Sequence, residues 1–489
     1  MTRSSRLIFL LILLPICSPA QTTNSAITRA TAAMEAAAPR AQSDPAHPIF
    51  HVTSPAQWMN DPNGPIFYKG FYHLFYQLNP FSDGDGPKYW GHVRSRDLVK
   101  WEPLPIALWP STEMGETGVW SGCCTVNGSG QPMIFYTSIA QGKSAFDHAE
   151  QWAATSDDSL IHWKKSPANP VLSEELHGGI KVYDWRDPFI FREGKKTFLV
   201  SGGHLEKQGR PAVNIYDAAN TDLTKWNYRG VLFQLPDNMP TAECPNFFKL
   251  GKQWVLFVSP YGKVNYFIGD FDATTCRFQP HSQGTLDFGS SFYAPNTMQL
   301  GDGRRLVWGW VNGFPGGHGW NGCLSLPRLL SVSDDGQLLQ QPAPQLSKLR
   351  GKSIEWRNLN RLLSHDASLT LPKTNALEIQ AEFAVKNGML QISLHSGAAN
   401  TEPIPISFSD SELHVMDAKA PLQLGRDQKL SLRIFIDHSV LEVFANETVC
   451  ITKVIPTLRD NAALEIDAGD SPATATIVRA WPMHTIWRN

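Results

Sequence analysis

The sequence of 489 residues predicts an all-β protein, with an N-terminal five-bladed β-propeller over residues 46–340 and a C-terminal β-sandwich over residues 354–489. Three observations lead to this fold class. A short segment with an acid, a leucine and a tryptophan recurs at a constant interval. Aromatic hairpin patterns begin at related positions. Beyond residue 353 the pattern changes to alternation of apolar and polar residues.

The recurring segment occurs three times, as SRDLVKW (95–101), SDDSLIHW (156–163) and NTDLTKW (220–226). Its tryptophans, Trp101, Trp163 and Trp226, are 62 and 63 residues apart. Self-similarity at a fixed interval is typical of repeat architectures. An interval of this length accommodates four strands with generous loops, which is the composition of one propeller blade.

Five segments join two apolar or aromatic runs through a turn that contains glycine, which is the signal of a β-hairpin. They begin at Asn60, Trp120, Arg186, Glu243 and Phe292. Five such starts predict five blades. The alternative interpretation is an ordinary all-β sandwich in which the similarity of these segments is accidental.

The N-terminal residues 1–20 combine two arginines, an apolar run and small residues before Gln21, a pattern typical of a secretory signal peptide. We therefore expect a secreted protein, periplasmic or extracellular. Residues 21–45 are expected to be a leader or linker, or a short helix outside the fold, and residues 341–353 a second linker.

The C-terminal segment 429–455 alternates Val, Ile and Phe with polar residues, which predicts half-buried strands. Two acids in this segment, Asp437 and Glu442, are interpreted as turn and surface residues.

Composition argues against several classes of partner. The net charge is −2 from 43 basic and 45 acidic residues, without a basic tract, so nucleic acid is not expected. No second membrane-spanning candidate follows the signal peptide. CxxC, HExxH and P-loop motifs are absent from the sequence, so no metal and no cofactor are expected. The cysteines lack a framework spacing and are expected to be mostly free thiols.

Three acids open hairpin segments and have a proline close behind: Asp61 in WMNDPNG (58–64), Asp187 in RDP, and Glu243 in ECP. In a propeller the first strand of each blade lines the central axis, so these acids would converge. Converging carboxylates raise each other's pKa and are costly unless they are used. One such acid alone is explained by turn capping, but three at equivalent positions indicate a functional site.

Glycoside hydrolysis needs two carboxyl groups with separate tasks. Asp61 lies between asparagines in a turn whose N–H groups favour the ionised form. Glu243 precedes Cys, Pro and two Phe, and desolvation there would raise its pKa and keep it protonated. Asp187 follows Arg186, a cation that favours an ionised neighbour.

The ordered motifs WMNDPNG, FYHLFYQLNP, YWGH, WSG, WRDP, ECP, FYA and GW, followed by IDHSVLEVFAN, resemble glycoside hydrolase family 32. This is the family of invertases, inulinases and levanases, and the resemblance covers residues 46–489. It implies a five-bladed propeller with a β-sandwich, and retaining hydrolysis of terminal β-D-fructofuranosyl units from sucrose or fructans.

The resemblance also implies residue roles. Asp61 would be the nucleophile, Glu243 the acid/base and Asp187 the transition-state stabiliser, with the Asp61 and Glu243 carboxyl groups about 5–5.5 Å apart. The fructose pocket would be lined by Asn60, Gln77, Trp90, Trp120, Ser121, Arg186, Tyr293 and Trp310. Trp90 and Trp310 are equally well explained as core tryptophans.

Two positions depart from the family pattern. Ala242 stands where the family usually has Trp, and Asn246 where many bacterial members have Asp. We expect both residues at the mouth of the site. The resemblance therefore does not determine which leaving group the site prefers. Three other functions remain: a fructosyltransferase using the same site, a related five-bladed family acting on arabinosides or xylosides, and a non-catalytic sugar-binding protein. The ranking of sucrose, inulin and levan, and the oligomeric state, are not fixed by the sequence.

Overall fold

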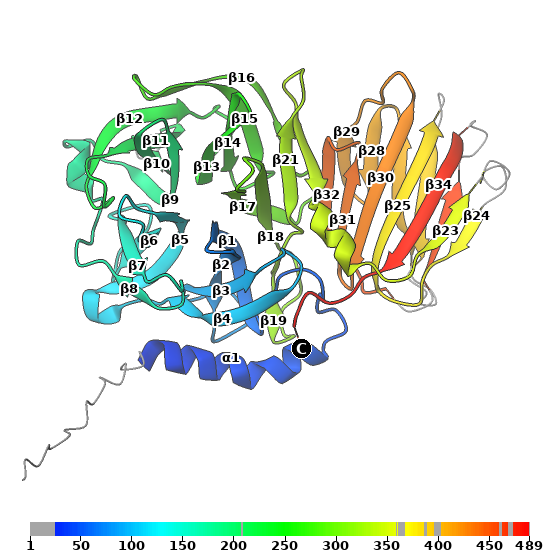
Figure 1. The fold of residues 1–489 in the computed structure, drawn as a ribbon, viewed down its shortest axis with the longest axis horizontal. Helices are drawn as coiled ribbons and strands as arrows, with labels where there is room; N and C mark the ends of the chain where they lie inside the picture. Colours follow the sequence, from blue (N-terminus) through cyan, green and yellow to red (C-terminus); the bar gives the residue numbers. More distant parts are fainter. Residues whose placement is uncertain are drawn as a thin grey trace, which may run out of the picture.

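The computed structural model describes residues 25–206, 209–357, 359, 367–385, 389–395, 402–458, 462–467 and 473–488. The all-β prediction is confirmed, because seven β-sheets account for most of these residues. The sheets form two bodies side by side (Figure 1). The signal peptide predicted for residues 1–20 lies outside the described residues.

Five sheets of four or five strands build the first body. The first sheet contains β1 (Gln57–Tyr68), β2 (Phe71–Asn79), β3 (Tyr89–Ser95), β4 (Trp101–Leu108) and β19 (Trp320–Asn321). The second contains β5 (Glu116–Val126), β6 (Pro132–Ala140), β7 (Glu150–Ser156) and β8 (Trp163–Lys165). The third contains β9 (Tyr183–Glu193), β10 (Lys196–His204), β11 (Pro211–Ala218) and β12 (Trp226–Gln234).

The fourth sheet contains β13 (Glu243–Leu250), β14 (Gln253–Ser259), β15 (Asn265–Asp272) and β16 (Arg277–Thr285). The fifth contains β17 (Phe292–Gln299), β18 (Arg305–Val311), β20 (Cys323–Leu324), β21 (Arg328–Val332) and β22 (Leu338–Pro342). Two short 3₁₀ helices, η1 (Thr112–Met114) and η2 (Glu174–His177), lie in the connections.

The first strands of the five sheets, which we call the inner strands, form a closed ring. β1 contacts β5, β5 contacts β9, β9 contacts β13, β13 contacts β17, and β17 contacts β1 (Figure 1). The ring is also tied by β19, which follows β18 in the chain but pairs in parallel with β1. We call the end where the inner strands begin the acid end of the ring, and the opposite end the far end.

Each inner strand has a shift of pairing register near the acid end. The shifts fall between Met59 and Pro62, Val119 and Gly122, Arg186 and Phe189, Glu243 and Asn246, and Tyr293 and Asn296. Such bulges turn side chains out of the regular alternation and are common next to active sites.

Proline marks four of these five bulges, at Pro62, Pro188, Pro245 and Pro295. Proline has no N–H to give to a sheet ladder, so a bulge is one of the few places where it fits in a strand. The residues before three of them, Asp187, Cys244 and Ala294, have positive φ angles of 60°, 47° and 45°. Non-glycine residues occupy this region at a cost, and such strain collects at functional sites.

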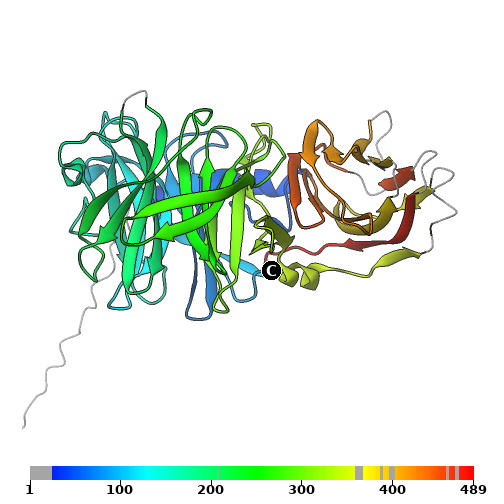
Figure 2. The same cartoon turned by 90° about the horizontal axis from the view of Figure 1, so that it is seen from above.

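The second body consists of two six-stranded sheets stacked around one apolar core (Figure 2). One sheet contains, in spatial order, β23 (Ile354–Arg357), β34 (Ala473–Pro482), β25 (Ala376–Val385), β30 (Lys429–Asp437), β31 (Val440–Ala445) and β32 (Val449–Val454). The other contains β24 (Ala367–Thr370), β33 (Ala463–Asp467), β26 (Leu390–His395), β27 (Ile404–Ser409), β28 (Glu412–Val415) and β29 (Ala418–Pro421). The linker before this body includes the 3₁₀ helix η3 (Pro344–Leu349).

The expectation that residues 21–45 lie outside the fold is wrong for the helix α1 (Ser25–Ser43). This helix contacts β1 and β4 and buries Ala30 and Ala41 completely. Its alanine-rich composition allows close packing against the ring (Figure 1). Among the described residues, no helix combines the length and apolar composition needed to span a bilayer.

The interpretation of Asp437 and Glu442 as turn and surface residues is also wrong. Both are buried at the junction of the two bodies, in a cluster of charges that we call the junction cluster: His51, Asp287, Arg328, Asp437 and Glu442. Arg328 bonds Asp287 at 2.8 Å and Glu442 at 2.7 Å. His51 lies 2.8 Å from Asp437 and 3.1 Å from Glu442. Each acid is buried because a cation from a distant segment neutralises it.

Candidate active site

Asp61, Asp187 and Glu243 lie on β1, β9 and β13, at the bulges of the acid end. Cys244 shows how close two of them come, because its Sγ lies 3.6 Å from Oδ2 of both Asp61 and Asp187. Glu243 is the residue before Cys244 in the chain. The structure therefore brings the three predicted acids together, as equivalent positions on inner strands predicted.

Asp61 is held by a network of neutral donors. Ser121 donates to Oδ2 at 2.5 Å and Asn60 to Oδ1 at 3.0 Å. Gln77 links these two donors, because it accepts from Asn60 at 2.7 Å and donates to Ser121 at 2.7 Å. Trp58 fixes the orientation of Asn60 by donating to its Oδ1 at 3.0 Å. Both oxygens of Asp61 thus accept hydrogen bonds from side chains whose own positions are set, which fixes the orientation of the carboxyl group.

Asp187 is buried and tied to its neighbours through the backbone. Its Oδ2 accepts the N–H of Cys244 at 2.8 Å, and its own N–H donates to Thr137 at 2.8 Å. Burial raises the pKa of Asp187 to about 6, against the lowering effect of Arg186 and the Cys244 N–H. The expected influence of Arg186 is therefore present but weaker than desolvation.

Glu243 contacts one cation and one phenol. Arg186 lies 2.7 Å from Oε1, and Tyr293 donates to Oε2 at 2.5 Å. Burial nevertheless raises the pKa of Glu243 to about 7, and the charges of Asp187 and Asp61 act in the same direction. Arg186 and Tyr293 oppose this rise. At neutral pH Glu243 is therefore poised between its acid and base forms, as general acid–base catalysis requires.

Aromatic side chains surround the acids at different depths. Trp120 and Trp310 are half-buried, and Trp310 packs edge-on against Trp58 with ring centroids 5.6 Å apart. Arg186 lies 5.6 Å from the Trp120 ring. Tyr293 is also half-buried and faces Trp310 across the β17–β18 pair.

Trp90 is different, because its side chain is 0% exposed and belongs to a core cluster with Phe75 and Tyr136. Its N–H donates to the carbonyl of Trp120 at 3.1 Å. Trp90 thus supports Trp120 from behind and does not itself line the site in this structure. The core interpretation, not the pocket position that the resemblance implied, describes this residue.

The expected mouth positions of Ala242 and Asn246 are wrong. Both residues are almost fully buried. The carbonyl oxygen of Ala242 lies close to Gly202, and a Cβ added to Gly202 would stand only 2.1 Å from that oxygen. Asn246 donates to the carbonyls of Cys244 at 3.1 Å and Pro295 at 3.0 Å, which braces two neighbouring inner strands. Both departures from the family pattern therefore change packing beneath the acids.

Three contributors were not predicted: Asp184, Cys244 and Tyr261. Asp184 is buried and pairs with Arg186 at 3.0 Å, and Tyr261 accepts from Arg186 at 2.8 Å. Cys244 sits between two acids. A sequence signal existed only for Cys244, which stands between Glu243 and the bulge proline. Asp184 and Tyr261 carry no comparable mark.

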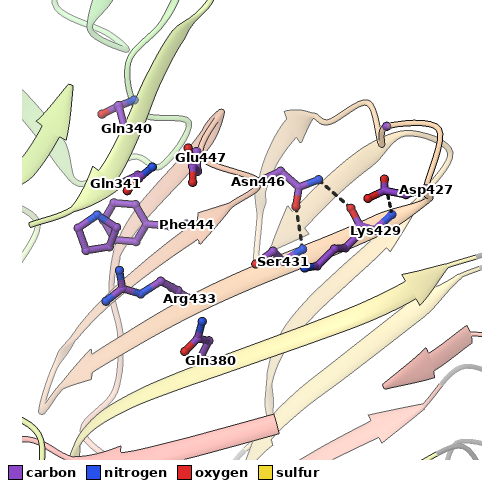
Figure 3. Close-up of a pocket in the computed structure, with 12 residues that line it drawn as sticks. Gln340, Gln341, Gln380, Asp427, Lys429, Ser431, Arg433, Phe444, Asn446 and Glu447 are labelled. Atoms are coloured by element: carbon purple, nitrogen blue, oxygen red, sulfur yellow. Dashed lines mark hydrogen bonds between the residues drawn. The ribbon is translucent and has the colours of Figure 1, made fainter. Parts of the chain in front are cut away.

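A cleft of about 740 Å³ lies between the ring and the stacked sheets, and it is linked to Glu243 through Tyr293, which donates to Glu243 and lines the cleft. Tyr261 and Tyr293 line it together with Lys263, Lys419 and Phe288. A separate pocket of about 410 Å³ lies farther along the junction, where Asn446 bonds Ser431 and Lys429 (Figure 3). None of the predicted site residues lines that second pocket.

The six cysteines of the described residues are all free, and five of them are buried. Within these described residues, no group of three or more His, Cys, Asp or Glu side chains is arranged to hold a metal ion.

Comparison with known proteins identifies two matched regions. Residues 51–342 match "Glycosyl hydrolases family 32 N-terminal domain", and residues 345–482 match "Glycosyl hydrolases family 32 C terminal". Similar curated proteins include a sucrose-6-phosphate hydrolase of Zymomonas mobilis, 32% identical over 86% of this chain and 88% of that protein. A levanase of Bacillus subtilis is 30% identical over 90% of this chain and 71% of that protein.

Solved structures agree with these matches. A Bombyx mori GH32 beta-fructofuranosidase mutant, solved in complex with sucrose, superimposes with a TM-score of 0.80 at 26% identity, over 96% of this chain and 100% of that one. Fructan 1-exohydrolase IIa of Cichorium intybus gives a TM-score of 0.80 at 25% identity, over 90% of this chain and 98% of that one.

Proposed function

Because the chain belongs to glycosyl hydrolase family 32, we propose that this glycosidase releases terminal β-D-fructofuranosyl units from sucrose or fructans with retention of configuration. One observation carries the proposal. A desolvated Glu243 with a pKa of about 7 stands in the same cluster as Asp61, whose two oxygens accept hydrogen bonds from Ser121 and Asn60. Two carboxyl groups in such contrasting environments supply the acid and the nucleophile of a double displacement.

In the proposed first step, a carboxylate oxygen of Asp61 attacks C2 of the fructosyl unit. Glu243 gives its proton to the glycosidic oxygen, the C2–O bond breaks, and the leaving group departs as an alcohol. The product is a fructosyl ester of Asp61. A carboxyl separation of about 5–5.5 Å is the geometry expected for this reaction, and it stays a prediction.

In the second step, Glu243 removes a proton from water, and the resulting oxygen attacks C2 from the face that the leaving group left. The ester bond breaks, fructose leaves, and Asp61 is again a carboxylate. Asp187 would accept hydrogen bonds from fructose hydroxyls that strengthen as charge develops at C2. Arg186 would hold Glu243 in reach while donating toward the same sugar.

The leaving group is proposed to point into the cleft of about 740 Å³. Tyr293 supports this placement, because it donates to Glu243 and also lines the cleft. A group protonated by Glu243 therefore departs next to this space. Sucrose, inulin and levan differ only in what occupies it.

The fold and location complete the proposal. We infer that the closed ring of five sheets is a five-bladed β-propeller over residues 46–340. The stacked sheets of residues 354–489 are inferred to be a β-sandwich, joined by the linker 341–353. Export follows from the signal-peptide pattern of residues 1–20. Cell fractionation should recover the protein outside the cytoplasm with an N-terminus near Gln21, and recovery in the cytoplasm with an intact Met1 would contradict export.

The test uses sucrose, inulin and levan with methanol as a second acceptor. Transfer to methanol fixes the anomeric configuration in a stable product, so NMR should detect methyl β-D-fructofuranoside. Asp61→Asn should lower kcat/KM by a factor on the order of 10⁴, because the variant lacks the attacking carboxylate. Formation of the α-anomer would rule out retention, and near-wild-type activity of Asp61→Asn would remove Asp61 from the mechanism.

A further inference from the structure

The far end of the ring contains a cavity of about 410 Å³ that the proposed reaction does not use. All five inner strands reach it with their last residues, including Phe67 of β1, Val126 of β5, Arg192 of β9, Lys249 of β13 and Gln299 of β17. Asp61, Asp187 and Glu243 lie toward the beginnings of three of the same strands. The lining of the cavity begins at Gly64 and Phe189, two to three residues beyond Asp61 and Asp187, and continues to the ends of the inner strands.

Arg305 of β18 is the principal charge in the wall of this cavity. The residue is only 8% exposed, and its guanidinium lies 4.3 Å from the centroid of the Phe248 ring. Nη1 donates to Thr297 Oγ1 at 2.9 Å. Nε is buried and has no hydrogen-bond partner among the described residues. No carboxylate forms an ion pair with Arg305 within the part of the chain that the structure describes.

The other two buried arginines among the described residues show what is unusual here. Arg328 lies 2.8 Å from Asp287 and 2.7 Å from Glu442, and Arg186 lies 3.0 Å from Asp184 and 2.7 Å from Glu243. Burying an unpaired cation costs several kcal/mol, so buried charges are normally paired. Burial alone lowers the pKa of Arg305 to about 9, with no opposing carboxylate.

The neighbours of Arg305 cannot supply the missing negative charge. Thr297 donates its hydroxyl hydrogen to Asn246 Oδ1 at 3.0 Å, so it offers Arg305 only a lone pair. The remaining charged residues that line the cavity are Arg192 and Lys249, both cations. Arg192 donates to the Val126 carbonyl, and Lys249 pairs with Glu193 at the surface. The cavity wall therefore carries positive charge and includes no acid.

We propose that this far-end cavity binds a small inorganic oxyanion of the phosphate class, with Arg305 as its principal ligand and Arg192 at the rim. The planar guanidinium offers parallel N–H donors that match the oxygens of such an anion. The site lies apart from the proposed fructosyl chemistry and does not depend on it.

The test is isothermal titration of the full chain with inorganic phosphate at constant ionic strength, balanced with chloride. We expect saturable binding to one site. Arg305→Gln should weaken it by about tenfold to a hundredfold, the loss expected for one charge-assisted contact. Arg304→Gln is the matched control, because Arg304 is the adjacent residue but is exposed and pairs with Asp302. That control should bind phosphate like the wild type.

Thermal unfolding gives a second readout. Phosphate should raise the Tm of the wild type above that in chloride of equal ionic strength, with the logarithmic concentration dependence of a ligand that binds the native state. Absence of binding heat, or equal binding by Arg305→Gln, would overturn the proposal. If Arg305→Gln does not fold, Arg192→Gln decides: weakened phosphate binding supports the site, and unchanged binding refutes it.

Discussion

Two groups of three acids occupy different surroundings in this molecule: one group is half-buried or buried at the acid end of the ring, and the other is fully buried at the junction of the two bodies. Asp61, Asp187 and Glu243 meet at the acid end of the ring, where Arg186 pairs with Glu243 and its charge acts on Asp187. Asp287, Asp437 and Glu442 meet in the junction cluster, where Arg328 and His51 lie between them.

The pKa values show how far the surroundings can offset burial. In the junction cluster burial alone would raise the pKa of Asp437 and Glu442, but His51 holds both pKa values below their usual range, helped at Glu442 by the charge of Arg328. Asp287 differs, because burial keeps its pKa raised despite its contacts with Arg328 and Thr452. At the acid end burial wins, and the pKa values of Asp187 and Glu243 rise to about 6 and about 7. Burial therefore does not decide the charge of an acid. The balance between burial and the available cations and donors does, and at Glu243 this balance leaves a proton available for catalysis.

The largest expected effect concerns that proton. Glu243→Gln should lower kcat on sucrose by a factor on the order of 10³, because the amide has no proton to give to the leaving oxygen. Fructosides whose leaving group is already acidic should lose far less activity. The stability of the variant should equal that of the wild type. Kinetics on both substrate types check the idea, and an equal loss on both would contradict the acid role.

The acid end was predictable from sequence because its signals are local and repeated. Asp61, Asp187 and Glu243 each open an aromatic hairpin segment with proline close behind, and four of the five bulges carry that proline. The pairing of Asp437 with His51 has no such mark, since the two residues are separated by 386 positions in the chain.

The burial of individual side chains could not be predicted either, because it also depends on contacts between segments that are far apart in the chain. Trp90 and Trp310 both follow aromatic strand patterns, yet one is fully buried and the other half-buried. Asn246 braces Cys244 and Pro295 from below, which depends on a neighbouring inner strand. Contacts across sheets decide these positions, and a single strand pattern does not contain them.

The second prediction removes one charge from the junction cluster. Glu442→Gln should lower the free energy of unfolding by roughly 3 kcal/mol, because an amide replaces the carboxylate between Arg328 and His51. The kcat per folded molecule should stay near the wild-type value. Urea unfolding measures the change, and Glu412→Gln, a partly exposed acid on β28, serves as the matched control. An unchanged free energy of unfolding would show that the junction cluster is not held by its charges.

The smallest effect concerns the pH profile. Glu243 must be protonated to act as an acid, so kcat/KM should fall as the pH rises through its pKa of about 7. The hydrogen bond from Tyr293 lowers the pKa of Glu243 by favouring its charged form. Tyr293→Phe should therefore move the alkaline limb to higher pH, by about one unit or less.

The acidic limb of kcat/KM reports groups that must be ionised, such as Asp187. Asp187 accepts its hydrogen bond from the Cys244 N–H and none from Tyr293, so this limb should not move in Tyr293→Phe. Tyr266→Phe removes a phenol elsewhere in the ring and should leave both limbs in place. A downward shift of the alkaline limb in Tyr293→Phe would mean that the phenol stabilises protonated Glu243. Tyr293 would then hold the proton on Glu243 instead of favouring its carboxylate form.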